Sequence, residues 1–185
     1  MNEQKKILES QIREIYGRVV YTHKTHEKCA DVLKKRSDYL KFGEIFLSAV
    51  TTTSILVVLF GDGQIFQFLA ALFSTILLAL TLYTKDFNLL GIAEKHKQAA
   101  LNILEIREKL LSLLVDIKIG NKEIETLQHK RDELNEQLIN TYRGAPKTIN
   151  KAYQIASIAL KENEEFTFSD EEIDKFLPDS LKKNI

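Results

Sequence analysis

The sequence predicts an all-α membrane protein, in which a two-helix transmembrane hairpin continues into a cytosolic helical bundle. Three observations lead to this fold class. The 185 residues include only two Pro and seven Gly, a composition typical of long helices with few interruptions. Residues 45–84 contain one charged side chain, that of Asp62. On both sides of this stretch, apolar residues recur at alternating steps of three and four, as they do in packed helices.

The uncharged stretch divides into two membrane helices at residues 61–64, which hold its only turn signal. As helices, residues 45–60 would span roughly 24 Å and residues 65–83 roughly 28 Å, against a hydrocarbon core of about 30 Å. The alternative is a soluble bundle that buries both segments, but core helices usually keep one polar face. These two segments carry no charge on any side, which favours the membrane.

Lys and Arg residues lie near both ends of the hairpin, whereas its turn has none. Because basic flanks stay in the cytosol, we expect both termini on the cytosolic side of the membrane. The expected organisation is a cytosolic N-terminal helix at residues 1–44, the hairpin at 45–84 and a cytosolic helical region at 85–185. Cys29 is the only cysteine of the chain, which fits a reducing compartment.

Each helix that adjoins the hairpin carries an apolar seam, so we expect both helices to run from the membrane into the cytosol. Spacing alone does not decide whether the seams close within one chain or between chains. We expect a homo-oligomer, because the seams are longer than the chain's own remaining helices. The expected seam residues are Leu8, Ile12, Ile15, Val19, Thr22, His26, Cys29, Leu33, Arg36 and Leu40 before the hairpin, and Leu89, Ile92, His96, Ala99, Ile103, Ile106, Leu110, Leu113 and Ile117 after it.

Three shorter helices are expected after Gly120, where the second seam ends. One at about residues 122–143 can fold back on the preceding helix, and another is expected at about 147–163. Ser169 followed by Glu172 is a capping-box pattern, which predicts a last short helix. The expected apolar faces are Ile124, Leu127, Arg131, Leu134 and Leu138 in the first of these helices, and Ile149, Tyr153, Ala156 and Leu160 in the second.

Composition argues against several functions. Lys plus Arg and Asp plus Glu both number 26, so the chain lacks the positive excess that direct nucleic-acid binding normally needs. The sequence has no Gly-rich phosphate loop, no nucleophilic Ser elbow and no convergent carboxylate pair, so we expect neither an enzyme nor a cofactor. His23 and His26 lie one helical turn apart, but no acidic or Cys cluster completes a metal site around them.

Polar residues within the cytosolic helices are candidates for signal sensing. The richest polar cluster spans residues 21–27 and includes Tyr21, His23 and His26, while His96 interrupts the seam of the other helix. Such residues either set the register of the packed helices or sense pH. The acidic residues 162–174 enclose two Phe side chains, and such segments are usually solvated but can also dock on a partner.

The membrane helices carry a second group of candidates, a pore or packing face. Gln67, Ser74 and Thr81 are seven residues apart and share one side of the second helix. Ser48 and Thr52 belong to a hydroxyl cluster in the first helix. Small and hydroxylated residues at such positions pack helices together or line a pore. Two helices per chain cannot enclose water, so conduction would require a homo-oligomer.

Residues 15–28 (IYGRVVYTHKTHEK), followed by a two-helix hairpin, resemble the SLATT proteins, the SMODS- and SLOG-associating two-transmembrane effectors. Residues 166–173 (FTFSDEEI) extend the resemblance, which is closest to the fifth subfamily. The resemblance implies an effector of a bacterial conflict system that permeabilises or depolarises the inner membrane on a partner's signal. The partner it implies is a synthase or sensor of a nucleotide signal, or a reverse transcriptase. The alternative is a non-conducting membrane anchor or scaffold for a soluble partner.

Overall fold

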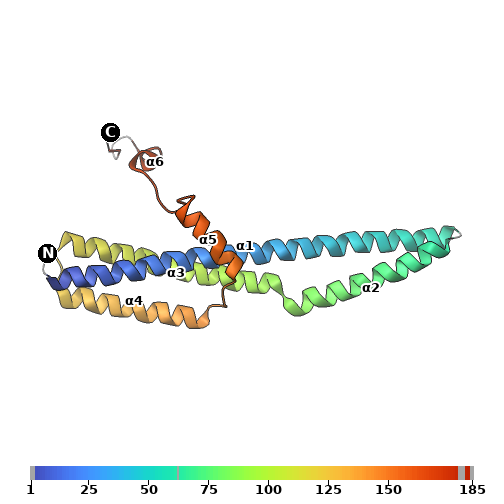
Figure 1. Ribbon diagram of the computed structural model, residues 1–185, viewed down its shortest axis with the longest axis horizontal. Helices are drawn as coiled ribbons and strands as arrows, with labels where there is room; N and C mark the ends of the chain where they lie inside the picture. Colours follow the sequence, from blue (N-terminus) through green and yellow to red (C-terminus); the bar gives the residue numbers. More distant parts are fainter. Residues whose placement is uncertain (1–2, 62, 179–181, 184–185) are drawn as a thin grey trace.

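The computed structural model describes residues 3–61, 63–178 and 182–183, so Asp62 of the expected turn lies outside the described residues. Within the described part of the chain there are six helices and no strand, which confirms the all-α fold class. Figure 1 shows a rod with a helical hairpin at one end and a bundle at the other. The helices are α1 (Glu3–Phe60), α2 (Gln64–Phe87), α3 (Leu89–Ile119), α4 (Ile124–Gly144), α5 (Asn150–Lys161) and α6 (Asp170–Asp174).

The longest helix, α1, runs without a break through both the bundle and the hairpin, as its uninterrupted seam predicts. Its 58 residues correspond to about 87 Å at 1.5 Å per residue. The last part of α1 packs against α2 to form the hairpin, and the first part packs against α3. The hairpin therefore continues rigidly into the bundle through α1.

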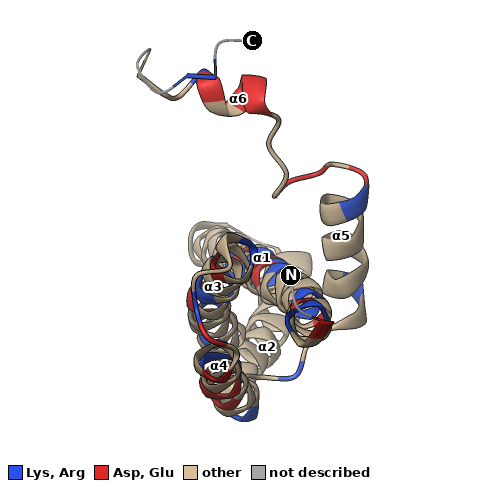
Figure 2. Cartoon of the chain, turned by 90° about the vertical axis from the view of Figure 1, so that its left-hand side faces the viewer, with Lys and Arg blue, Asp and Glu red and all other residues tan. Residues whose placement is uncertain are grey.

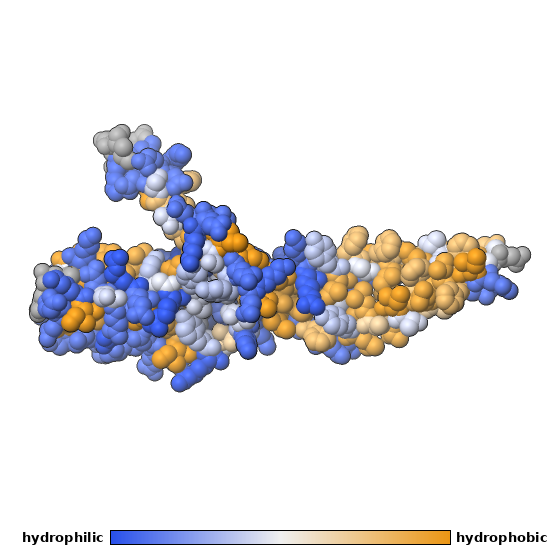
Figure 3. All heavy atoms as spheres, in the orientation of Figure 1, coloured by the Kyte–Doolittle hydropathy of each residue, from blue (hydrophilic) through white to orange (hydrophobic). Residues whose placement is uncertain are grey.

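The hairpin exposes its apolar side chains to the surroundings. In the most apolar windows of α1 and of the helix that begins at Gln64, 11 % and 0 % of the residues are buried. Figure 3 shows the resulting apolar surface along this end of the rod, beside a polar bundle. The core helix of a soluble protein would be mostly buried, so these two helices have the length and the exposure of membrane spans.

The two long seams close on each other within one chain. Most buried apolar residues of α1 and α3 form one core with those of α4, which folds back on α3 as expected, and Leu33, Leu89 and Ala93 form a second, smaller cluster. The expected homo-oligomer was argued from seams too long for one chain to cover. Because one chain covers them, the length of the seams no longer supports that expectation. Two seam positions were also wrong, because Ser37 is buried instead of Arg36 and Ala93 instead of Ile92. The core comprises Leu8, Ile12, Ile15, Val19, Ile103, Ile106, Leu110, Leu113, Ile117, Leu127, Leu134 and Leu138.

The short helix α5 crosses α1 and buries a different face from the expected one. Its buried residues are Ala152, Ala156 and Ala159, whereas Tyr153 is exposed. Small side chains allow the backbones of α1 and α5 to approach closely, whereas the larger Tyr153 stays largely exposed although its ring centroid lies 6.1 Å from that of Tyr21 on α1. Of the expected apolar face, Ala156 is buried and Leu160 half-buried, whereas Ile149 and Tyr153 are exposed, so the prediction was wrong at these two positions.

A bend at Asn88 separates α2 from α3. Asn88 adopts a left-handed backbone conformation (φ 35°, ψ 54°), and its side-chain oxygen accepts a hydrogen bond of 3.1 Å from the backbone N–H of Gly91. Asn tolerates this conformation better than other residues with a side chain. The bend carries the chain out of the hairpin into the bundle, while the Asn88 side chain caps the first turn of α3.

Alanine substitution at two glycines should have different effects on stability. A Cβ added at Gly91 would lie 2.5 Å from Nδ2 of Asn88, so Gly91→Ala should displace the cap, and the cost of about 1 kcal/mol should cancel the gain in helix propensity. Gly17 lies in an exposed part of α1 with open space around it, so Gly17→Ala should stabilise the chain by about 0.5–1 kcal/mol. Denaturant unfolding of both variants in one detergent, followed by circular dichroism, would measure the difference. Equal stabilisation by both would contradict the capping role.

Candidate functional site

Four consecutive residues of α1, His23 to His26, are all buried. A helix that packs on one side buries only every third or fourth residue, so burial of four in succession requires neighbours on several sides. Here α3 covers one side of α1 and α5 another. The chain segment after α5 returns to the same place and puts Phe166 against the side chains of His23 and Lys24. The polar cluster that the sequence singles out is therefore the junction of three parts of the chain.

His26 and His96 form a buried pair across the contact between α1 and α3. Their Nδ1 atoms lie 2.9 Å apart, and the two residues are 3 % and 1 % exposed. One ring donates the hydrogen bond and the other accepts it, so the pair is complete only when at least one ring is neutral. Burial lowers the pKa of His26 to about 4, with further lowering by His96 and His23, and burial also lowers the pKa of His96. Both rings are therefore held in the neutral form.

His23 lies between an arginine and a carboxylate. Nη1 of Arg107 is 3.4 Å from Nδ1 of His23, and Oε1 of Glu27 is 3.6 Å from Nε2. Because a guanidinium only donates, Nδ1 accepts and the proton of the neutral ring is on Nε2, on the side of Glu27. Burial lowers the pKa of His23; Glu27 opposes this effect, and the positive charges of Arg107 and Lys24 add to it.

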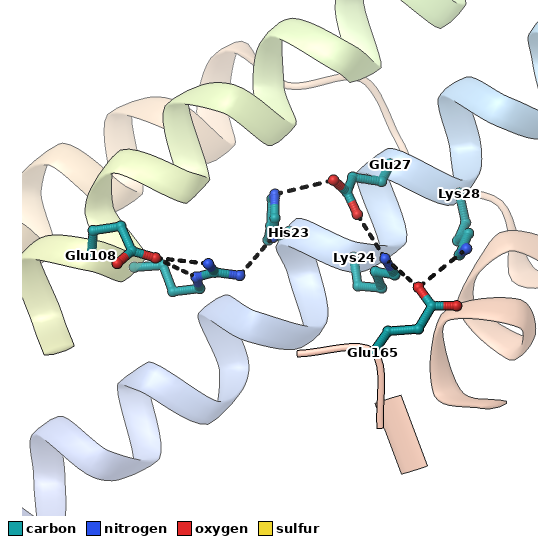
Figure 4. A network of polar contacts seen from close by, with 7 residues as sticks. His23, Lys24, Glu27, Lys28, Glu108 and Glu165 are labelled. Carbon is teal, nitrogen blue, oxygen red and sulfur yellow. Dashed lines mark hydrogen bonds and ion pairs between the residues drawn. The ribbon is translucent and has the colours of Figure 1, made fainter. Parts of the chain in front are cut away.

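Lys24 is a buried cation that shares two carboxylates (Figure 4). Its Nζ lies 2.6 Å from Oε2 of Glu165 and 3.0 Å from Oε2 of Glu27, and Lys28 reaches the same Glu165 oxygen at 3.6 Å. Burial alone would lower the pKa of Lys24, but the hydrogen bonds to Glu165 and Glu27 raise it overall. A buried ammonium is tolerated only where such partners compensate its lost hydration.

The segment that supplies Glu165 and Phe166 is turned back toward α1 at the end of α5. Glu164 adopts a left-handed conformation with φ 50°, and the backbone N–H of Glu165 donates to the carbonyl of Ala159 at 3.0 Å. The Phe166 ring stacks on the His23 ring, with centroids 5.4 Å apart and planes 16° apart. Glu165 and Phe166 of the acidic segment therefore dock on their own chain.

Three of the four predicted sensing residues lie between α1 and α3, and the fourth faces α5. His23, His26 and His96 lie between α1 and α3, whereas the Tyr21 ring faces Tyr153 of α5 at 6.1 Å. The Tyr21 hydroxyl is buried and has no hydrogen-bond partner among the described residues. Sequence reasoning missed Arg107, which lies beside the seam of α3 without any local signal. It expected the segment with Phe166 to be solvated or to dock on a partner, whereas Phe166 packs on His23 and Lys24 of its own chain.

A groove of about 570 Å³ begins at His23 and Lys24 and runs between α1 and α3. Its lining includes apolar residues together with basic and acidic side chains. The described residues contain no group of three or more His, Cys, Asp or Glu that could hold a metal ion. Among the groove's lining residues are Lys28, Lys34, Ala93, Lys97, Leu101 and Leu104.

The predicted pore or packing face lies outside the contact between α1 and α2. Gln67, Ser74 and Thr81 are exposed, and so are Ser48 and Thr52. At about 100° per residue, the line of Gln67, Ser74 and Thr81 is roughly a quarter turn around α2 from the side that meets α1. The buried hydroxyl residues of the hairpin are instead Thr51 and Ser54, which the sequence did not distinguish from their neighbours.

The hydroxyls on these outward faces bond to their own helix. Ser74 donates to the carbonyl of Ala71 at 3.0 Å, and Thr52 donates to the carbonyl of Ser48 at 2.9 Å. Such bonds satisfy a hydroxyl without a neighbouring helix. No hydrogen bond of the Gln67 side chain to another described residue is present, so its amide needs water, lipid headgroups or a second chain.

These features define a class of protein, the all-α proteins with a two-span membrane hairpin that continues into a helical bundle. Residues 8–172 match the family model described as SMODS and SLOG-associating 2TM effector domain family 4. The chain therefore belongs to this family of two-transmembrane membrane effectors. No curated protein and no solved structure matches it.

The family match confirms the resemblance to SLATT proteins but corrects the subfamily. The matching model is that of family 4, not of the fifth subfamily. The match extends from the first turns of α1 through the hairpin to α6, so it includes the junction and the membrane helices. A reverse transcriptase partner was implied by the fifth-subfamily resemblance alone, and that implication loses its basis.

Proposed function

We propose that this chain is a membrane effector of a bacterial anti-phage or conflict system, which oligomerises in the inner membrane and dissipates the membrane potential on a partner's signal. Membership of the two-transmembrane effector family supports the membrane and effector parts of this proposal. We add to this that the chain oligomerises, that the oligomer conducts, and that a partner's signal triggers conduction. Both termini face the cytosol in this arrangement, because basic residues flank an uncharged hairpin.

The observation that carries the permeabilising role is the outward position of Gln67, Ser74 and Thr81. A line of polar side chains along most of a membrane helix is unfavourable against lipid tails. The hairpin's own interface does not cover this line. Several copies, arranged with these lines facing a common axis, would enclose a hydrated path that one hairpin cannot form.

The runner-up function is a non-conducting membrane anchor or scaffold, and one observation favours it. The Ser74 hydroxyl already has a backbone acceptor within α2, so it can face lipid at a moderate cost. In that case the bundle would hold a soluble partner at the membrane, and the hairpin would only retain it there. The two functions differ in whether expression changes the permeability of the membrane.

Induced expression should depolarise bacterial cells, as read by a potential-sensitive dye. Reporter fusions after residue 185 should be active in the cytosol, whereas a fusion inserted at residues 61–64 should be active in the periplasm. A chain with this topology that leaves the potential intact, alone or with its neighbouring gene products, would favour the anchor. Periplasmic activity of the C-terminal fusion would contradict the topology itself.

A further inference from the structure

Glu165 and Phe166 occupy a cationic surface on α1 and α3 in the manner of a bound ligand. The Phe166 ring has Nζ of Lys24 at 4.5 Å and Cζ of Arg107 at 4.7 Å from its centroid, and it stacks on His23. Cations at these distances attract the face of an aromatic ring. The Glu165 carboxylate adds the ion pair with Lys24 at 2.6 Å. The surface on α1 and α3 thus binds an acidic and an aromatic side chain that are adjacent in the chain.

The docked part of the tail is small. Glu164, Thr167 and Phe168 around it are exposed, with Phe168 62 % accessible. Figures 1 and 2 both show α6 well away from the bundle. The side chains of Glu165 and Phe166 therefore make most of the contact between the tail and the bundle. Another segment with an acidic and an aromatic side chain can readily replace a contact of this size.

We infer that this surface is a docking site for an acidic-aromatic segment of a partner protein, and that the chain's own Glu165 and Phe166 fill it until the partner displaces them. The receptor site consists of His23, Lys24, Lys28 and Arg107. Glu27 and Glu108 neutralise part of its charge, with Glu108 2.7 Å from Arg107. Lys24 and Arg107 nevertheless each present a face to the ring, and Lys24 keeps one contact for an incoming carboxylate.

The contacts of Lys24 explain why the receptor site is kept filled. With the tail in place Lys24 is 7 % exposed, and the Phe166 ring supplies part of this cover. Loss of the tail would remove the ion pair with Glu165 and the contact with the Phe166 ring, and water would replace them only in part. A competing segment that brings both a carboxylate and an aromatic ring restores both contacts.

The adjoining groove favours a foreign partner over a second copy. A tethered segment has an effective concentration on the order of millimolar, so an identical segment from another copy cannot compete at micromolar concentrations. The groove of about 570 Å³ that starts at His23 and Lys24 is not lined by the docked tail. A longer partner segment can add contacts there, to the apolar wall at Leu101 and Leu104 and to Lys97.

Binding of a labelled peptide with the sequence of residues 162–168 tests the receptor site in the full chain in detergent. If the peptide binds the emptied site at roughly 100 μM and the tether supplies about 1 mM, the double variant Glu165→Ala/Phe166→Ala should bind about tenfold more tightly than the unmodified chain. Adding Arg107→Ala to the double variant should remove most of this binding. Phe166→Ala alone is a milder way to empty the site, and Phe168→Ala is the matched control that should bind like the unmodified chain.

The groove is tested with peptides that extend the same sequence by three varied residues on either side. The tightest of them should bind the unmodified chain better than the native sequence does. They should lose that advantage with Leu101→Glu in the groove but not with Leu111→Glu, a leucine of α3 with similar exposure that does not line the groove. No binding of any peptide to the Phe166→Ala and double variants would overturn the inference. It would also be overturned if tail-deficient chains captured Arg107→Ala chains, which carry a tail, more strongly than they capture other tail-deficient chains, because the occupant would then be the tail of a second copy.

The peptide measurements need no membrane activity, so they stand apart from the proposed function. Only one consequence rests on that function: displacement of the tail at the junction of α1 and α3 should alter the hairpin that these helices continue into. Peptide binding with an unchanged membrane potential would thus count against the effector role and leave the docking site intact.

Discussion

Gln67→Leu combined with Ser74→Leu is expected to abolish depolarisation while the protein still inserts and assembles. Each leucine eases insertion by up to about 1 kcal/mol, so the double variant should reach the membrane at least as well as the unmodified chain. The same substitutions make a water-filled lumen less favourable, because they remove polar groups along the outward line of α2. The structure leaves both side chains outside the hairpin's own contact, so the fold of one chain should not change.

Thr75→Leu is the matched control for this pair. Thr75 is at the depth of Ser74, is exposed, and likewise donates to the carbonyl of Ala71, but it lies about 100° around the helix. Dye-reported depolarisation and oligomer size should be measured on the same preparations at matched expression. Full depolarisation by the double variant would eliminate the pore-face hypothesis. A smaller oligomer for Ser74→Leu would indicate that this line packs helices.

The hairpin and the bundle core could be predicted because each depends on a long repeating pattern. Absence of charge over residues 45–84 and the three-four spacing of Leu and Ile are signals carried by many residues at once. A few wrong positions, such as Arg36 in place of Ser37, do not alter such a pattern. The family resemblance added the membrane effector class, which spacing alone does not give.

The details that were missed depend on single residues whose neighbours come from distant parts of the chain. The α5 contact is made by alanines, and hydrophobicity gives them less weight than Ile149 or Tyr153. Arg107 becomes part of the junction only because α3 packs beside His23. The bend at Asn88 did have a local signal, since Asn tolerates left-handed backbone and Gly91 leaves room for its side chain.

Acidification should destabilise the bundle through the pair of His26 and His96. The folded pKa of His26, about 4, is below the ordinary value of 6.5, so the unfolded chain binds more protons between these two values. Stability is therefore retained above pH 6.5 and lost as the pH falls toward 4. For His26 alone the loss should be about 2 kcal/mol at pH 5 and about 3 kcal/mol at pH 4, and the lowered pKa values of His96 and His23 act in the same direction.

Denaturant unfolding of the full chain in detergent at pH 7, 6 and 5 would measure this loss. In this window Glu165 stays ionised, because the contact with Lys24 lowers its pKa below the ordinary 4.5, so its titration does not obscure that of the histidines. The double variant His26→Leu/His96→Leu should retain a much smaller pH dependence, due to His23. His129→Gln, at an exposed position of α4, is the control for removal of a histidine outside the buried pair.

The single variant His26→Leu distinguishes the effect of losing the hydrogen bond between His26 and His96 from the effect of losing a group that titrates. It leaves the buried His96 ring without its partner, so at pH 7 it should cost about 1–3 kcal/mol. It should be less stable than the double variant, in which two apolar side chains replace both rings. If the unmodified chain and the double variant lose stability equally between pH 7 and 5, the pair does not respond to pH. Its role would then be to fix the register of α1 against α3 within the bundle.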